Sequence, residues 1–364
     1  MLEKAKLTDP TPLTSSGESI EIQHACINRS LYPCILLESY LASNLWERTN
    51  GQVEFVTWSF PELGLDAVNT LYLIEDGTLD SATVSGGYVG GQIPAIEIQD
   101  LWGMYSSQEQ EFEASQAIIK DIERLVLAEA GGVILSHNWY AGVDQFLFCR
   151  DGIGTPEEFA GKKTRSHAAA LSDWLNGMGA LAVFVAFAEA YTTIEREVLN
   201  CGVTHPEAAF RQRWYEVTDY MIGPLVSFPF VNNVINRDVW RSMPDDLQRI
   251  LIEEAAKSEL EQLRLASIQN LTGLQNNLDA GIELVEFSPE IRWHSFDVAL
   301  KEHVIPGWLR RLGYPGAGRD GVDLFNDGVG PYVGLRIDPD GSVVTVLITK
   351  GPHEGKTMEE VLSE

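Results

Sequence analysis

Short strand-like segments and longer helix-like segments alternate along the first quarter of the chain. Apolar residues recur every three to four positions in the helix-like segments and alternate with polar residues in the strand-like ones. The expected elements are strands at 20–28, 52–58 and 79–84 and helices at 32–48 and 65–75. Asn50-Gly51 and Asp76-Gly77 stop the two helices. This β-α-β-α-β order predicts a mainly parallel sheet and an α/β fold.

The same alternation continues beyond a Gly-rich loop at 86–94. We expect helices at 109–130, 168–178, 189–198 and 211–221, and strands at 133–137, 145–150, 161–167, 180–187 and 230–236. The strand at 180–187 is continuously apolar, which predicts burial, and it is far shorter than the roughly 18 residues that a membrane helix needs. A long helix from Ser242 to about Asn277 would span roughly 50 Å, enough to brace two domains. The tail after Pro331 predicts a hairpin around a Pro339-Asp340-Gly341 turn.

Length and charge narrow the class of protein. A chain of 364 residues predicts about two domains. With 53 acidic against 26 basic residues, the net charge of −27 argues against nucleic acid or an anionic lipid surface as a partner. An anionic ligand therefore needs a local positive group that acts against the field of the whole protein.

The motifs give no catalytic or metal centre, and we expect no cofactor. The four cysteines, Cys26, Cys34, Cys149 and Cys201, form no CxxC pair and no zinc-ligand spacing with His. We interpret them as buried free thiols; a disulfide in an oxidising compartment stays open, and the spacing gives no pairing. Residues 316–321 match GxGxxG but follow a helix-like segment, so we interpret them as a turn.

Arg165 is the candidate for the local positive group. Thr155 and Pro156 begin a helical segment, and Arg165 ends the short strand that follows. In open α/β sheets the carboxyl ends of the strands meet at the ligand crevice, where an arginine offers a bidentate fork to a carboxylate. The alternative is an ordinary surface charge.

Several segments taken together identify a family. The chain resembles the substrate-binding proteins of tripartite ATP-independent periplasmic (TRAP) transporters, solute-binding protein family 7, over about residues 20–330. The resemblance rests on the order and spacing of TNGQVEFV, IEDGTLDSAT, TPEEFAGKKTR, NGMGALAVFVAFAEAYTTIE, WYEVTDYMIGP and VINRDVWRSMPDDLQRILIEEAA. It implies two α/β domains joined by crossing strands, one long helix spanning both, and a small organic acid bound in an interdomain cleft.

The resemblance also implies site residues. Arg165 falls on the family's carboxylate-clamping arginine, Phe187 on an aromatic residue that packs against the ligand, and Gln145 on a second polar contact. Residues at the cleft edge of the first domain would be Asn28, Ser85 and Tyr88. Trp139 and Tyr140 follow the strand at 133–137 and are further candidates for lining the cleft. Ordinary core packing is the alternative role for these aromatic residues. Asn232 and Asn233 are weaker candidates for ligand binding than all of the residues above.

The chain departs from the family pattern where some members bind a cation. Asn200 and Cys201 replace a common acidic residue and glycine, and Thr204 and His205 occupy the place of an acid and a tryptophan. We therefore expect no metal at the site.

The resemblance divides the chain as follows. We expect a disordered lead-in at 1–19, a first domain at 20–143 plus about 226–270, a second at 144–225 plus about 271–330, and a C-terminal hairpin extension at 331–364.

The predicted function is capture of a small organic acid, with an apolar or aromatic part, in the periplasm and its delivery to the membrane subunits of a TRAP transporter. The protein itself would neither insert into the membrane nor catalyse a reaction. Residues 1–21 show no leader, so a cytoplasmic location stays open. The alternatives are an α/β enzyme acting on a carboxylated substrate and a carboxylate sensor built on the same binding domain.

Overall fold

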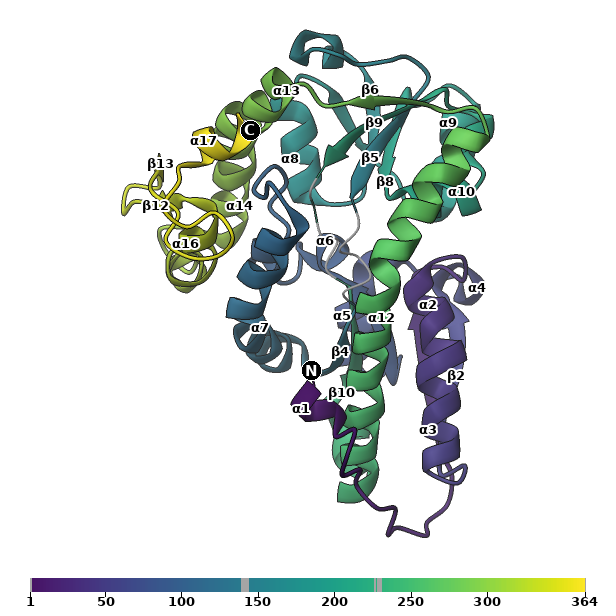
Figure 1. Ribbon diagram of the computed structural model, residues 1–364. Coiled ribbons are helices and arrows are strands. Elements are labelled where there is room, and N and C mark those ends of the chain that lie inside the picture. Colours follow the sequence, from purple (N-terminus) through teal and green to yellow (C-terminus); the bar gives the residue numbers. More distant parts are fainter. Residues whose placement is uncertain (1, 139–143, 226, 228–230, 364) are drawn as a thin grey trace. The chain divides into compact units, whose positions relative to one another are not determined.

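The computed structural model describes residues 2–138, 144–225, 227 and 231–363. The chain divides into two compact units of α/β structure, labelled by element in Figure 1. The first unit comprises Met1–Val89, Asp121–Ala141 and Phe230–Ile268, and the second comprises Gly90–Lys120, Gly142–Pro229 and Gln269–Glu364. The predicted α/β fold class is confirmed.

The sheet of the first unit begins as the sequence predicts. Its strands are β1 Ile20–Cys26, β2 Val53–Ser59, β3 Ser81–Ser85, β4 Gly132–His137 and β10 Val231–Asn236. Their order among the described residues is β2-β1-β3-β10-β4. β1 pairs in parallel with β2 and β3, while β10 lies antiparallel between β3 and β4. The parallel β-α-β-α-β arrangement is therefore confirmed, and a strand from late in the chain completes the sheet.

Several helices belong to the first unit. They are α1 Leu2–Ala5, α2 Tyr32–Leu36, η1 Leu37–Ala42, α3 Ser43–Arg48, α4 Phe60–Leu63, η2 Ala67–Asn69, α5 Thr70–Glu75, α6 Gly86–Val89 and α11 Arg237–Ser242. α2, η1 and α3 run on without a break, which confirms the helix expected at 32–48. Asn50 and Gly51 then adopt positive φ angles of 49° and 77° and end it. Its buried leucines pack with apolar residues of the long helix, among them Leu37, Leu41, Leu45, Leu247, Ile250 and Leu251.

Two long helices contribute to both units. α7 spans Gln108–Ala130, and α12 spans Asp245–Asp279, a run of 35 residues. Both confirm the helices expected from the sequence. No helix in the described part of the chain combines the length and the apolar character needed to span a bilayer.

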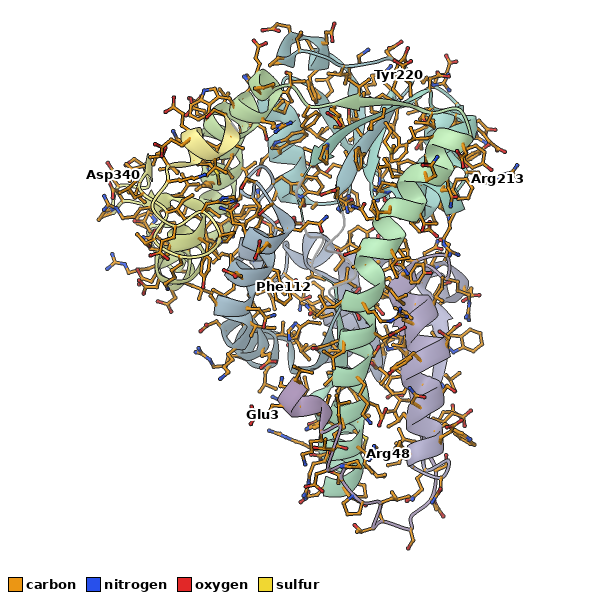
Figure 2. All side chains as sticks on the ribbon, viewed as in Figure 1. Glu3, Arg48, Phe112, Arg213, Tyr220 and Asp340 are labelled. Carbon is orange, nitrogen blue, oxygen red and sulfur yellow. A yellow bond between two sulfur atoms is a disulfide. The ribbon has the colours of Figure 1, made fainter. Side chains whose placement is uncertain are left out.

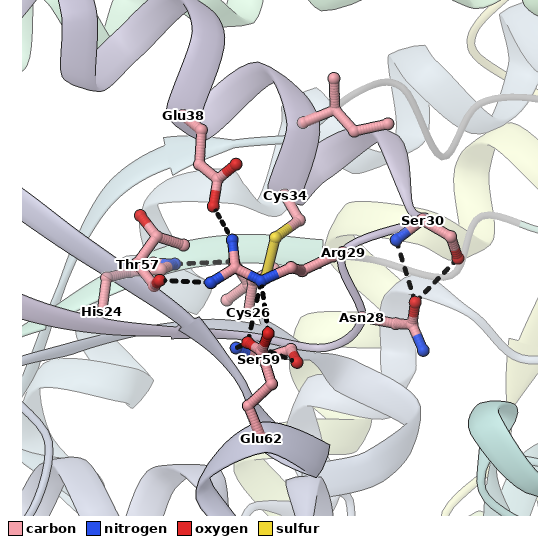
Figure 3. Close-up of a disulfide and its surroundings, with 12 residues drawn as sticks. His24, Cys26, Asn28, Arg29, Ser30, Cys34, Glu38, Thr57, Ser59 and Glu62 are labelled. Carbon is pink, nitrogen blue, oxygen red and sulfur yellow. Dashed lines mark hydrogen bonds and ion pairs between the residues drawn. A yellow bond between two sulfur atoms is a disulfide. The ribbon is translucent and has the colours of Figure 1, made fainter.

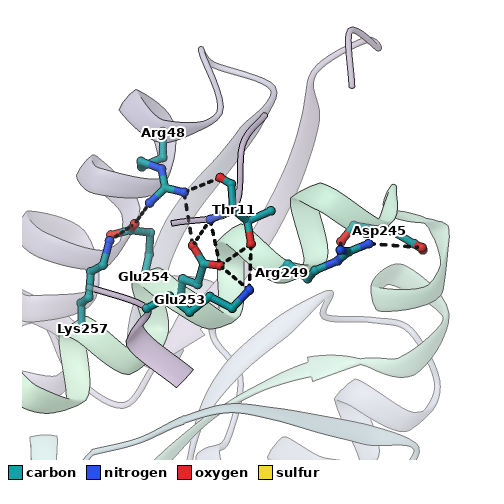
Figure 4. A network of polar contacts seen from close by, with 8 residues as sticks. Thr11, Arg48, Asp245, Arg249, Glu253, Glu254 and Lys257 are labelled. Atoms are coloured by element: carbon teal, nitrogen blue, oxygen red, sulfur yellow. Dashed lines mark hydrogen bonds and ion pairs between the residues drawn. The ribbon is translucent and has the colours of Figure 1, made fainter. Parts of the chain in front are cut away.

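The N-terminal segment differs from the disordered lead-in that its polar composition predicts. The Thr11 amide donates to the Glu253 carboxylate at 3.1 Å, and the Thr14 and Ser15 amides each donate to Asp246 at 2.7 Å. Arg48 joins the same network through the Thr11 carbonyl and Glu254 (Figure 4). Carboxylates on α12 thus provide acceptors for the backbone of a segment that has no apolar pattern of its own.

The sheet of the second unit mixes parallel and antiparallel strands. The strands are β5 Gln145–Cys149, β6 Lys163–Ser166, β7 Leu181–Phe184, β8 Cys201–Thr204, β9 Tyr220–Leu225 and β11 Glu283–Glu286. Their order in the described chain is β11-β9-β5-β8-β6-β7. β6 pairs in parallel with β7 and β8, whereas β5 runs antiparallel to β8 and β9.

Two sequence expectations for this sheet are wrong. The strand expected to be buried at 180–187 is the edge strand β7, where Leu181 and Phe184 are 52% and 50% exposed. The helix expected at 211–221 is also absent, because η7 Trp214–Glu216 is short and β9 begins at Tyr220 (labelled in Figure 2). In β9, pairing with β5 and β11 overrides the local helical spacing.

The remaining helices belong to the second unit. They are η3 Pro94–Gln99, η5 Pro156–Phe159, α8 Ala169–Gly177, η6 Phe187–Glu189, α9 Ala190–Glu195, α10 Pro206–Arg211, α13 Pro289–His294, η8 Ser295–Val304, α14 Ile305–Leu312, α15 Arg319–Leu324, η9 Phe325–Val329, α16 Gly330–Val333 and α17 Met358–Leu362. The Thr155 and Glu158 side chains form a capping box at η5, as the sequence indicates. The GxGxxG match at 316–321 follows the helix α14 and not a strand, and the turn expected there covers only its first part, because α15 begins at Arg319.

The tail forms the expected hairpin. β12 Leu335–Ile337 and β13 Val343–Thr345 pair antiparallel, and exposed Asp340 stands in the turn between them (Figure 2). α17 follows the hairpin and completes the described chain.

The interpretation of the cysteines as free thiols is wrong. Cys26 is bonded to Cys34, and Cys149 to Cys201, with Cα–Cα distances of 5.6 and 4.2 Å. All four cysteines belong to the described chain, and none of them is free. Cys149 and Cys201 face each other across β5 and β8, a pairing that their separation of 52 residues does not reveal.

Candidate functional site

The carboxyl edge of the second unit's sheet brings two predicted site residues to one side. β6 and β8 are parallel, so both end at this edge, and Arg165 is the third residue of β6. β5 runs antiparallel to β8, so its first residue, Gln145, begins at the edge where β8 ends. Gln145 and Arg165 are both buried there, in strands separated only by β8.

The Arg165 side chain is buried and held in one orientation. It is only 2% exposed, which corrects the alternative of a surface charge. Its Nε donates to the Val185 carbonyl at 2.9 Å, and its Nη1 donates to the Val203 carbonyl at 2.7 Å. Val203 lies in β8 and Val185 directly follows β7, so the acceptors come from both sides of β6. The fold thus fixes a positive charge at the carboxyl edge.

Phe187 lies beside this charge. The Cζ atom of Arg165 is 5.7 Å from the centre of the Phe187 ring, within the range of a cation–π contact. The Phe187 ring is buried and lies 6.1 Å from the Trp214 indole. One aromatic side chain therefore contacts both the guanidinium and the core.

His167 and Trp102 extend the cluster, and the sequence reasoning missed both. The Nδ1 atom of His167 is 3.4 Å from Arg165 Nη1, and the Trp102 indole lies 5.8 Å from the imidazole, edge to face. Burial, assisted by the Arg165 charge, lowers the pKa of His167 well below its usual value, so the imidazole is neutral. The i, i+2 spacing of Arg165 and His167 places both on one face of an extended strand and was a usable signal. Trp102 stands in an irregular segment, which offers none.

A buried carboxyl group lies two residues before Trp102. The Ser227 hydroxyl donates to Asp100, and burial is the main reason that the pKa of Asp100 is raised to about 8. The hydrogen bond from Ser227 acts in the opposite direction, and the charge of Glu97 adds to the rise. Asp100 is therefore largely protonated at neutral pH, so no buried negative charge is added next to that of Glu97.

His205, at the place where some family members bind a cation, has a structural role. His205 precedes α10, and its Nδ1 accepts a hydrogen bond from the Ala208 amide at 3.3 Å. Burial lowers the pKa of His205 to about 3, so the imidazole remains a neutral acceptor. No cluster of three or more His, Cys, Asp or Glu residues that could hold a metal occurs in the part of the chain that the structure describes.

The carboxyl edge of the first unit's sheet holds three more predicted residues. Ser85 ends β3, Tyr88 follows it in α6, and Asn28 follows β1, which is parallel to β3. The Asn28 side chain accepts hydrogen bonds from the Ser30 amide at 2.9 Å and from the Ser30 hydroxyl at 2.8 Å. Two further predicted residues, Trp139 and Tyr140, lie outside the described residues.

A disulfide anchors the loop that carries Asn28. Cys26 ends β1 and Cys34 lies in the first turns of the next helix (Figure 3). Arg29 in the same loop donates to Glu62 at 2.8 Å and to the Thr57 carbonyl at 2.8 Å, and it also pairs with Glu38. The disulfide and the ion pairs of Arg29 therefore both fix the position of the loop.

Buried side-chain amides also lie at this edge, and the sequence analysis gave them too little weight as site candidates. Asn233, in β10, donates to the Ser136 hydroxyl at 3.0 Å, and Gln262 of α12 donates to Asn138 at 2.7 Å. Asn138 follows β4, and its Nδ2 atom and the Oε1 atom of Gln262 are buried without a partner among the described residues. Polar atoms of this kind are suited to meet a ligand. An isolated amide in a sequence gives no sign of such a network.

A family model matches most of the chain. Residues 32–303 match the model described as "Bacterial extracellular solute-binding protein, family 7". A relative from Albidiferax ferrireducens, named "Solute-binding protein", is 23% identical over 251 residues, which cover 68% of this chain and 73% of the relative.

Solved structures share the fold. A TRAP periplasmic solute-binding protein from Desulfovibrio salexigens, solved with orotic acid, has a TM-score of 0.76 at 19% identity, covering 86% of this chain and 99% of its own. The extracytoplasmic solute receptor DctP7 of Bordetella pertussis, which binds pyroglutamic acid, has a TM-score of 0.77 at 16% identity, covering 85% and 99%.

Proposed function

Because the chain belongs to family 7 of the bacterial extracellular solute-binding proteins, we propose that it captures a small organic acid in the periplasm and delivers it to a TRAP transporter. The observation that carries the proposal is the buried Arg165 guanidinium, oriented by the Val185 and Val203 carbonyls. Such a group suits a carboxylate, because the planar fork offers parallel N–H donors and cannot lose its charge.

The body of the ligand would lie against the groups around the clamp. Phe187 and Trp102 supply aromatic surface, which favours an acid with a ring or an apolar portion. Gln145 would supply a polar contact, and Asn28, Ser85, Tyr88, Trp139 and Tyr140 are proposed as further contacts. Orotic and pyroglutamic acid, the ligands of the two similar proteins, are both ring-containing acids.

The disulfides support a location outside the cytoplasm. Disulfides persist in oxidising compartments such as the periplasm and are rare where thiols are kept reduced. The sensor alternative would share this binding site but not the partner. A leader sequence encoded upstream, together with neighbouring genes for membrane subunits, would support transport.

We propose binding without chemical conversion of the ligand. The enzyme alternative needs a nucleophile or an acid–base pair beside Arg165, and the strongly lowered pKa of His167, which packs against Trp102, makes this imidazole a weak base. Mass spectrometry of the acid after incubation with the protein should return it unchanged, and a converted product would favour the enzyme.

Calorimetry on Arg165 variants tests the clamp. We expect Arg165→Ala to weaken binding of the acid by about 200- to 5,000-fold, since an unpaired buried carboxylate costs roughly 3–5 kcal/mol. Arg165→Lys should restore part of the affinity, and Arg196→Ala, at an exposed arginine of the same unit, should leave it unchanged. Melting curves are needed as a control, because the Val185 and Val203 carbonyls lose their donor in Arg165→Ala. Binding by a folded Arg165→Ala protein within threefold of the wild type would overturn the assignment.

The position of the ligand in an interdomain cleft stays a prediction. Small-angle scattering with and without the acid should then give a smaller radius of gyration in the bound state. An unchanged radius at saturation would contradict it.

A further inference from the structure

A second cavity lies in the second unit, away from the Arg165 cluster. Its volume is about 360 Å³, and Arg165, Phe187 and Gln145 are not among its lining residues. The walls come from the loop at 103–107, the end of β9, the segment from Phe287 to Ser295, and the tail. The tail lies beyond residue 303, where the match to the family model ends.

One side of the cavity is apolar. The apolar lining residues are Pro224, Leu225, Phe287, Val361 and Leu362. Leu225 and Phe287 belong to the buried core, so this wall is rigid, while the last two residues come from the tail helix α17. The cavity therefore offers a fixed apolar surface to the body of a ligand.

The serines that line the cavity already have partners. The Ser106 hydroxyl donates to Gln110 at 3.0 Å, and the Ser107 hydroxyl accepts from the Gln110 amide at 3.2 Å. The Ser295 hydroxyl accepts from the Trp174 indole N–H at 2.7 Å. These contacts hold the serines in the walls, and the Ser107 and Ser295 hydroxyls, which act only as acceptors in them, still carry a proton of their own.

Three other polar residues line the cavity. The hydroxyl of Tyr105, a residue only 6% exposed, and the Nε2 atom of His353 have no hydrogen-bond partner among the described residues. Arg292 donates from Nε to the Phe287 carbonyl at 3.2 Å and makes no ion pair within residues 2–138, 144–225, 227 and 231–363. A cation, a phenol and an imidazole thus line a cavity that has one apolar side.

The Tyr105 hydroxyl is suited to donate. Burial is the largest cause that raises the pKa of Tyr105 well above its usual value, and the charges of Glu111 and Asp100 add to the rise, so the phenol keeps its proton. The small opposing effect of Ser115 does not amount to a hydrogen bond of normal geometry. A buried donor without an acceptor is unfavourable, and a ligand oxygen would remove that penalty.

We propose that this cavity is a second binding site, which takes a small monocarboxylate with a compact apolar or aromatic body. Arg292 pairs with the carboxylate, Tyr105 and His353 complete its hydrogen bonds, and the ring or alkyl part packs on Phe287 and Leu225. The volume lies near the lower end of the range for small-molecule sites, roughly 300–1,000 Å³, which excludes a large ligand. The apolar wall favours an organic anion over an inorganic one.

Equilibrium dialysis of the full chain with radiolabelled benzoate tests the site. We expect the Arg165→Ala protein to retain benzoate binding, because the clamp is not part of this cavity. In the Arg165→Ala background, which removes binding at the clamp, Arg292→Gln should weaken benzoate binding by at least tenfold, and Tyr105→Phe, which removes only the hydroxyl, by about three- to tenfold. Arg310→Gln, at an exposed arginine on α14, is the matched control and should bind like the wild type.

Two outcomes would overturn the proposal. One is a folded Arg165→Ala/Arg292→Gln protein that binds benzoate as the Arg165→Ala protein does. The other is an Arg165→Ala protein that binds no benzoate, which would place any benzoate binding at the clamp. A failure of the proposed transport function would be seen in a different experiment, the calorimetry on Arg165 variants. There, the Arg165→Ala protein would bind the transported acid with unchanged affinity.

Discussion

The guanidinium of Arg165 lies against the face of the Phe187 ring, with Cζ 5.7 Å from the ring centre. The ring therefore stabilises the buried charge directly, in addition to any contact it makes with a ligand. This gives Phe187 two roles, of which the sequence resemblance suggested one.

Phe187→Leu separates apolar volume from aromatic character. The substitution keeps an apolar side chain but removes the cation–π contact, which is worth about 0.5–2 kcal/mol. We expect affinity for the acid to fall by roughly 2- to 30-fold in calorimetry. Phe184→Leu, at a half-exposed phenylalanine of β7, is the control. Equal affinities for the two variants would show that the ring does not serve the clamp.

Asp100 should make the stability of the protein depend on pH. Its pKa is raised from 3.8 to about 8, chiefly by burial, so the folded state holds a proton that the unfolded state releases between these values. Stability should therefore fall as pH rises through this window, by up to roughly 1.4 kcal/mol per pH unit, and level off above about pH 8. Urea unfolding of wild type and Asp100→Asn at pH 5, 7 and 9 measures this difference.

The Asp100→Asn protein should lose that slope, since the amide does not ionise. Asp340→Asn, in the exposed turn of the tail hairpin, should follow the wild type, because the pKa of Asp340 is lowered and it stays ionised across this range. Parallel curves for wild type and Asp100→Asn would contradict the assignment.

Arg311 should be needed for stability. It donates to Glu97 at 2.7 Å and to Asp173 at 2.6 Å, and Glu97 is almost fully buried. Arg311→Met would leave Glu97 without its cation and should cost about 3–5 kcal/mol, measured as the shift in the urea midpoint. The double variant Glu97→Gln/Arg311→Met should recover part of the loss, and Arg310→Met should cost little. A loss no greater than that of Arg310→Met would exclude this role.

The two disulfides should contribute unequally. Cys149–Cys201 spans 52 residues and Cys26–Cys34 spans 8, so chain-entropy estimates give about 4 and about 2.5 kcal/mol. Paired Cys→Ala variants, compared in urea, should therefore show the larger loss for the Cys149/Cys201 pair. The reverse order would mean that strain or residual structure in the unfolded chain outweighs loop length.

Local signals made much of the fold predictable. The helices at 32–48, 109–130 and 242–277 were readable because apolar spacing, caps and stops act within a few residues. The helix expected at 211–221 failed because pairing with β5 and β11 decides the structure of β9. The predictions of a buried strand at 180–187 and of free thiols were wrong for the same reason, because strand burial and cysteine pairing both depend on strands that are distant in the sequence.

The candidate site was predictable only in part. Arg165 could be singled out because it follows a capped segment and lies near the end of a strand. The i, i+2 spacing of Arg165 and His167 was also visible in the sequence. Trp102 and Asp100 could not be found, because they stand in an irregular segment that reaches the cluster only through the fold.

The carbonyl contacts of Arg165 have a consequence for engineering. A variant meant to accept a cationic or neutral solute cannot simply exchange this residue, because the Val185 and Val203 carbonyls would both need new donors. Phe187 and His167 contact the guanidinium but do not supply the carbonyl acceptors that orient it. They are therefore better positions for a library of variants selected for a new ligand. Specificity could then be redirected among acids while the charge that defines the class is left in place.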